Sequence, residues 1–390
     1  MEWMIGLAAA CLLIRVGHAL YVVGLSRAKN AAGTMLRVAA DFCWAGLAFW
    51  AIGAAIWRGD RHWVAFASTT DPRLFALLAI TLIGTPIPAA AMSERSRFWP
   101  LATLSVLLGG IIIPWGGAIA THGWLARMGF QDDAGAGWLH LSAAAAALAG
   151  IWAVKARSGK YHRDGSATMI PGHSLPMSGI GALAMLVGWI PYLAVCTLMT
   201  NKGSVALSSM NAVLAAASAG LAAMLFGRYR YGKPDVVLTV MGLLGGLVAV
   251  SAGAGQIGCR SSILIGAVAG VLVPVAVVWI DLLAHIDDPA GVIAIHGMGG
   301  AWGALAVGLL LHGTISQRLH QAGIQLLGVG FFTVLGFGLT AVVCVVLSKL
   351  TRLRPSEDDE FDGLDLAEHD IGAYPDFQQT TIKSYHLREA

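Results

Sequence analysis

Two histidines lie inside long apolar stretches of the chain, where an imidazole is uncommon. His140 lies in segment 138–151 and His296 in segment 292–310, each followed by small residues. An ionisable side chain in a lipid-spanning helix is costly, so it usually faces the interior of a helix bundle or a pathway. Two such rings indicate that both line one pathway through the protein. The alternative is that each ring packs in the interior and hydrogen-bonds a neighbouring helix.

A pair of neutral imidazoles suits a substrate that changes its protonation. Each ring has one donor and one acceptor nitrogen, so adjacent rings can share a proton and present N–H or C–H edges to a small molecule. A metal site would need more ligands. Neither histidine belongs to an HxxxH or HxxE pattern, and no carboxylate lies within a turn of either. We therefore expect no metal, no other cofactor and no enzymatic activity.

Composition predicts an all-α polytopic membrane protein. Of 390 residues, 57% are hydrophobic and 12% are charged, and the mean hydropathy is +0.70. The net charge of +3 is too small and too dispersed to suggest a nucleic-acid partner. Five scattered cysteines form no CxxC motif, so neither a disulfide framework nor a metal site is indicated.

Eleven apolar segments have the roughly 20 residues that a transmembrane helix requires. They are approximately 3–25, 35–57, 74–92, 100–121, 138–154, 175–200, 205–226, 236–257, 263–284, 292–311 and 324–347. Alternate loops hold fifteen Lys and Arg residues against seven in the others, which predicts an outer N-terminus and a cytoplasmic C-terminus. We expect a membrane domain over residues 1–350 and a cytoplasmic tail over 351–390.

The two histidines recur five spans apart, in the fifth and tenth spans. Consecutive blocks of five spans have opposite topology, which is the arrangement of an inverted repeat with its site near the midplane of the membrane. The eleventh span then lies outside the repeats.

Two further features remain open from the residues alone. Segment 357–376 is acidic and lacks an apolar run, so it is either a docking segment or an unstructured solubilising end. Arg15 and His18 lie one turn apart in the first span, with Asp41 as the nearest candidate partner. A buried ion pair or a subunit contact explains Arg15 more simply than a second pathway.

Several motifs in a fixed order give the sequence a family resemblance. They are ALYVVGLSRAKN (19–30), SERSRF (93–98), PWGGAIATHG (114–123), DDAGAGWLH (132–140), HSLPM (173–177), GW (188–189), DDP (287–289) and IHG (295–297). With these motifs the sequence resembles the ammonium transporter (Amt/Mep/Rh) family over essentially its full length.

The resemblance implies eleven transmembrane helices, in two inverted five-helix repeats plus an eleventh helix, a homotrimer in the inner membrane, and one pore through each subunit. His140 and His296 would be the pore pair, Asp132 the carboxylate at the base of an outer vestibule, and Trp115 the aromatic wall that holds the cation. The tail would lie under the pore, where PII-type signalling proteins bind in this family.

The sequence departs from the family's outer site. Ile80 occupies the position of a gating Phe, Tyr192 replaces the second gating aromatic residue, and Cys196 occupies the position of a serine that binds the cation. Loss of an aromatic face and of a hydroxyl should weaken recruitment of a cation. The family's acidic residue after the DDP motif is here Gly291.

We therefore expect an ammonium or ammonia channel or transporter with a twin-histidine pore and an altered outer site. One alternative is a weakly conducting or non-conducting ammonium sensor that acts as a receptor for a PII-type partner. Another is a channel for a neutral gas.

Overall fold

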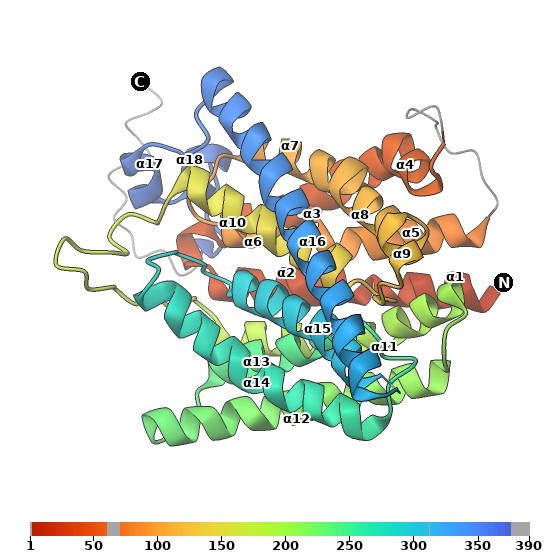
Figure 1. Cartoon of the computed structure of the whole chain (residues 1–390). Helices are drawn as coiled ribbons and strands as arrows, with labels where there is room; N and C mark the ends of the chain where they lie inside the picture. Colours follow the sequence, from red (N-terminus) through yellow and green to blue (C-terminus); the bar gives the residue numbers. More distant parts are fainter. Residues whose placement is uncertain (1, 61–70, 312, 376–390) are drawn as a thin grey trace, which may run out of the picture.

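The computed structural model describes residues 2–60, 71–311 and 313–375. This part of the chain is helical and contains no strand, only an isolated bridge between Tyr161 and Ala167 (Figure 1). Within it, ten helices are long and apolar enough to cross a membrane. The prediction of a multi-pass, all-α membrane protein is confirmed at this level.

The ten candidate spans combine consecutive helical segments. The first four are Glu2–Leu25, from α1 (Glu2–Cys11) and α2 (Leu13–Leu25); Ala28–Arg58, including α3 (Ala31–Ala48) and α4 (Ala54–Arg58); Pro72–Ala91, from α5 (Pro72–Gly84) and α6 (Ile87–Ala91); and Phe98–Met128, including α7 (Phe98–Leu107), α8 (Ile113–Thr121) and α9 (Trp124–Met128). Two spans begin with a π-helix: Ala136–Val154, from η4 (Ala136–Leu141) and α10 (Ser142–Val154), and Ile293–Leu310, from η5 (Ile293–Met298) and α15 (Gly299–Leu310). The other four are single helices: α11 (Leu175–Thr200), α12 (Val205–Tyr231), α14 (Cys259–Leu282) and α16 (Ile315–Leu350).

The predicted eighth span, 236–257, is shorter than expected. Its helix α13 (Val236–Val250) has 15 residues, about 22 Å of helix against a hydrocarbon core of about 30 Å. Residues 251–257 leave the helix because their carbonyls serve other partners. Ser251 and Ala252 accept hydrogen bonds from the N–H groups of Ala134 and Asp133, at 3.1 and 2.9 Å. Eleven full-length spans are thus not confirmed.

Polar residues at the membrane boundary begin several of these helices. Asp71 accepts the N–H of Arg73 at the start of α5, where Pro72 occupies the first turn. Ser174, Ser204 and Asp235 cap α11, α12 and α13 in the same way. Thr314 forms a capping box with Gln317 at the start of α16. These caps therefore fix where each of these apolar helices begins.

Small residues let the helices approach closely. A Cβ added to Gly17 of α2 would lie 2.5 Å from the carbonyl oxygen of Gly181 in α11, and one added to Gly270 of α14 would lie 2.1 Å from that of Ala219 in α12. Such contacts hold membrane helices together because lipid gives apolar side chains no preference for one another. The contact at Gly17 fixes the rotation of α2 about its axis and so decides which of its side chains point into the bundle.

The acidic tail is docked against the membrane helices as far as Pro375. Its helices α17 (Glu357–Asp362) and α18 (Leu364–His369) lie at the end of the bundle away from the N-terminus (Figure 1). Asp365 accepts the N–H groups of Ala32 and Gly33 at 2.9 and 2.6 Å. The remaining tail, residues 376–390, lies outside the described residues. So does Arg61, one of the seven Lys and Arg residues counted in the less basic set of loops.

Candidate functional site

His140 and His296 are stacked on one another in the interior of the bundle. Their ring centroids are 5.1 Å apart and the ring planes differ by 17°. His140 has no exposed surface and His296 is buried. Both nitrogens of His140 and Nδ1 of His296 have no hydrogen-bond partner among the described residues. Three buried ring nitrogens are therefore free to bind a small polar molecule between η4 and η5.

Both rings project from π-helical turns, η4 and η5. Turns of this kind are rare and often occur at functional sites, because the extra residue redirects a side chain. Each turn follows an aspartate that lies eight residues before the histidine, Asp132 before His140 and Asp288 before His296. The same device therefore presents each imidazole.

The Asp132 carboxylate organises the start of η4. It accepts four N–H groups, from Gly135 at 3.0 Å, Ala136 at 2.8 Å, Gly137 at 2.8 Å and Trp138 at 3.0 Å. Gly135 has a φ of +84°, which favours glycine. Burial raises the pKa of Asp132 to about 7, while the hydrogen bonds from Trp138, Gly137 and Ala136 act in the opposite direction.

Asp288 has the matching position before η5. Its Oδ2 accepts the N–H of Ile293 at 2.7 Å, and Gly291 between them has a φ of +64°. Burial raises the pKa of Asp288 to about 6, against the opposing hydrogen bonds from Ile293 and Val292. Gly291, which the sequence marks as a departure from the family, is thus part of the turn that leads to His296.

Aromatic side chains enclose the His140 ring. Trp189 stacks on it with centroids 5.2 Å apart and an angle of 16°, and the indole Nε1 donates to Ser251 Oγ at 3.0 Å. Tyr192 meets His140 edge-on at 6.3 Å, and its hydroxyl donates to the carbonyl of Ala134. Tyr192 is fully buried. It therefore lies between the histidine and the loop that carries Asp132.

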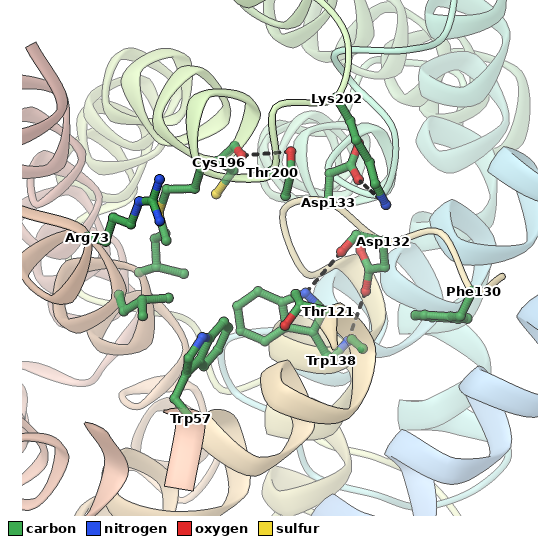
Figure 2. Close-up of a pocket in the computed structure, with 14 residues that line it drawn as sticks. Trp57, Arg73, Thr121, Phe130, Asp132, Asp133, Trp138, Cys196, Thr200 and Lys202 are labelled. Carbon is green, nitrogen blue, oxygen red and sulfur yellow. Dashed lines mark hydrogen bonds and ion pairs between the residues drawn. The ribbon is translucent and has the colours of Figure 1, made fainter. Parts of the chain in front are cut away.

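A cavity of about 330 Å³ borders the loop that carries Asp132 (Figure 2). Ile80, Asp132 and Cys196, three of the predicted outer-site residues, line it. Trp57 and Trp138 line it as well and meet edge to face, with centroids 5.4 Å apart. Arg73, Asp133 and Lys202 supply charge at its rim; Lys202 Nζ lies 3.9 Å from Asp133 Oδ1. The wall is thus aromatic, with charges of both signs.

Comparison with known proteins identifies the family. The model of the Ammonium Transporter Family matches residues 2–374. The chain belongs to the ammonium transporter family.

Individual relatives agree with this assignment over most of their length. The ammonium transporter Amt2 of Archaeoglobus fulgidus is 31% identical, covering 96% of this chain and 88% of its own. The putative ammonium transporter sll0537 of Synechocystis is 30% identical, covering 99% and 74%. A solved structure described as a sensor Amt protein has a TM-score of 0.89 at 29% identity, covering 94% and 97%. Mep2 of Candida albicans, at 24% identity and a TM-score of 0.81 over 99% of this chain and 92% of its own, shares the fold.

Among the residues that the family resemblance suggested for the outer site, Trp115 is not brought to the cavity. It is 42% exposed and is absent from the cavity lining. Gly117, two residues later on α8, contacts Trp57 of the cavity wall instead, because a Cβ there would lie 1.9 Å from the Trp57 ring. Two residues correspond to about 200° around a helix, so Trp115 points away from that side.

Four residues of the candidate site were not identified from the sequence: Trp57, Trp138, Trp189 and Asp288. The eight-residue spacing shared by Asp132 and Asp288 is a signal that the sequence contains. No comparable signal marks Trp57, because it reaches the cavity only through its packing on Gly117. Among the described residues, no group of His, Cys, Asp and Glu could hold a metal ion.

A charged network closes the opposite end of the bundle. Arg157 donates to Asp287 through Nε and Nη2, at 2.9 and 2.8 Å, and its Nη1 lies 3.4 Å from Glu94. Burial would raise the pKa of Asp287, but Arg157 and Arg95 lower it to about 2. The tail joins this region, since Glu360 accepts the N–H of Ser158 at 2.8 Å and Tyr374 hydrogen-bonds His173 at 2.7 Å.

Proposed function

We propose that this protein conducts ammonium nitrogen across the membrane, as ammonia, along a path that contains His140 and His296. The observation that carries the proposal is the stacked pair of buried imidazoles with three unpartnered nitrogens. Ammonia is small enough to pass between packed side chains, and it can donate to and accept from a neutral imidazole. The family's named relatives, including ammonium transporter Amt2, support this substrate.

The outer cavity recruits the cation in this proposal. The faces of Trp57 and Trp138 attract ammonium by about 0.5 to 2 kcal/mol, and Asp133 adds negative charge at the rim. Asp132 shapes the site without binding the cation directly, because both its oxygens already accept main-chain N–H groups. The cation releases its proton to water in the cavity, and ammonia continues past Tyr192.

The altered lining should make recruitment weak. Ile80 offers no aromatic face, and the Cys196 thiol is a poor hydrogen-bond donor. Arg73 and Lys202 add positive charge beside the aromatic pair. Half-saturation at high ammonium concentration is therefore expected.

The finer architecture forms part of the same proposal. Counting α13 as a short eighth span gives eleven helices, and the equivalent Asp–His pairs in η4 and η5 support two inverted repeats of five. An odd number of spans and the distribution of Lys and Arg favour an outer N-terminus and a cytoplasmic tail in the inner membrane. The homotrimer is proposed on family resemblance.

A second candidate function is ammonium sensing. The comparison structure described as a sensor Amt protein favours it, and the docked α17 and α18 would give a PII-type partner a defined surface. A neutral gas channel is a third reading, for which the apolar pore alone suffices.

Electrical recording on purified protein in liposomes distinguishes these functions. An ammonium gradient should evoke a current or an internal alkalinisation in wild type, and His140→Ala should abolish or change it. His320→Ala, an exposed position on α16, is the matched control. Ammonium binding without any flux in wild type would exclude conduction and favour the sensor.

A further inference from the structure

A third buried histidine, His18 of α2, has no role in the mechanism above. His18 of α2 is 5% exposed, and its Nε2 is buried without a hydrogen-bond partner among the described residues. Buried polar atoms of this kind are uncommon and call for an explanation. A hydrogen-bonding atom without a protein partner inside a membrane helix bundle indicates that a small polar molecule binds there.

The contact of α2 with the segment that leads to His296 supplies the second observation. The His18 ring lies within electrostatic range of His296 and of Arg15, and it interacts with the main chain of Pro86. Tyr21, one turn further along α2, donates its hydroxyl to the carbonyl of Ala290 at 2.8 Å. Residues three apart share a helix face. The face of α2 that carries His18 therefore points at the segment that carries His296.

The rotation of α2 is held rigidly in that orientation. Gly17, next to His18, packs against the main chain of Gly181 with no room for a Cβ. Arg15 is anchored on the neighbouring helices, with Nη1 2.5 Å from Asp41 Oδ2 and 3.0 Å from the carbonyl of Leu82. Thr85 donates to the same Asp41 oxygen at 2.7 Å. This ion pair explains Arg15, as the sequence suggested, but it leaves the Nε2 of His18 without a partner.

We propose that His18 is a third pore histidine, which takes ammonia from His296 by hydrogen bonding through its free nitrogen and extends the polar file from two rings to three. The inference rests on the proposed function, since it assigns the next site along the same path. The occupant is neutral ammonia or the water that replaces it, because a cation there would meet the Arg15 guanidinium. His18 is absent from the lining of the Trp57 cavity, so in this proposal it serves a part of the path beyond the twin histidines.

Flux through three variants tests the assignment. His18→Leu removes the polar atoms at similar volume and should lower ammonia flux in liposomes about five- to tenfold, the effect of one lost hydrogen bond at the barrier. His18→Gln keeps a donor and an acceptor and should restore most of the flux. His320→Leu is the control for an exposed histidine and should leave flux unchanged. Elution as a single species and an unchanged melting temperature establish that each variant folds.

A readout that does not need conduction separates this inference from the proposed function. With ¹⁵N-labelled histidine, the His18 signals, assigned from their loss in His18→Gln, should shift on addition of ammonium chloride, and sodium chloride should not shift them. If wild type conducts but His18→Leu matches it and the His18 signals do not move, the third site is excluded while the twin-histidine pore stands. If wild type does not conduct and the His18 signals still shift, ammonia binding at His18 is supported and conduction is excluded. If wild type shows no flux and the His18 signals do not shift, both the proposed function and the third site are excluded.

Discussion

The carboxylate of Asp132 holds the turn from which His140 projects, through four main-chain hydrogen bonds of 2.8 to 3.0 Å. Asp288 stands in the same position relative to His296, eight residues ahead. The two imidazoles are stacked because two equivalent turns bring them together from widely separated segments of the chain. In the proposed function the aspartates therefore act on the path through backbone geometry.

Asp132→Asn should destabilise the protein and distort the pore. The amide keeps one acceptor oxygen and places an NH2 donor where two N–H groups pointed at the second oxygen. Two buried donors without partners cost about 1 to 3 kcal/mol each. We expect a lower melting temperature in detergent and reduced flux. Asp164→Asn, at an exposed loop aspartate that also accepts a main-chain N–H, is the control, and an equal effect of both variants would contradict the orienting role.

The pH dependence of stability should change in the same variant. Because burial raises the pKa of Asp132 to about 7, the folded protein binds a proton that the unfolded chain releases near pH 4. Stability from this group is present below pH 4 and is lost as pH rises towards 7. The difference in melting temperature between wild type and Asp132→Asn should shrink over that interval; a growing difference would show that the carboxylate is charged throughout.

His140→Ala and His296→Ala should each abolish conduction or change its character while the protein still folds. Each truncation leaves a small void lined by aromatic and small side chains, and no hydrogen-bond partner of either ring is left unpaired, since the free nitrogens had none. Liposome flux and size-exclusion chromatography measure the two effects. Unchanged flux in both variants would remove the pore assignment.

Trp57→Leu and Trp115→Leu form a matched pair that locates the recruiting indole. Trp57 lines the cavity, whereas Trp115 does not and is 42% exposed. Loss of one aromatic face should weaken ammonium binding by about 0.5 to 2 kcal/mol, which raises half-saturation several-fold in Trp57→Leu. Trp115→Leu should leave half-saturation unchanged. The reverse ranking would return the recruiting role to Trp115.

The contrast between these two tryptophans shows what the sequence could predict. The length of the apolar segments predicted the helices, and the presence of an imidazole in two of them predicted that His140 and His296 lie in the interior of the bundle. Family motifs then identified Asp132 and the altered Ile80 and Cys196, all of which line the cavity. Those signals are local to one segment.

The features that the sequence did not predict depend on contacts between segments. Trp57 reaches the cavity because Gly117 on another helix leaves room for it. Helix α13 ends at Val250 because the loop after Asp132 takes the next carbonyls as acceptors. The π-turns of η4 and η5 have no composition that marks them, although the shared spacing from Asp132 and Asp288 could have suggested a common local structure.

The last prediction concerns Ile80 and Cys196, where the outer cavity departs from its family. Ile80→Phe would add an aromatic face to the cavity that Trp57 and Trp138 line, and Cys196→Ser would restore a competent hydrogen-bond donor and acceptor. Each change should strengthen cation binding by about 0.5 to 1.5 kcal/mol, so half-saturation for ammonium should fall several-fold in the double variant.

Binding and flux must be measured separately in these variants, because both positions are buried in the present packing. A Phe at position 80 that narrows the entrance would reduce flux while binding still tightens, and ammonium titration of the purified protein distinguishes that outcome from a simple gain. Leu77→Ile, a change of shape without new chemistry at another residue of the cavity wall, is the control. If neither Ile80→Phe nor Cys196→Ser alters affinity, the cavity does not bind the cation, and the gas channel or the partner-binding receptor becomes the better account of this protein.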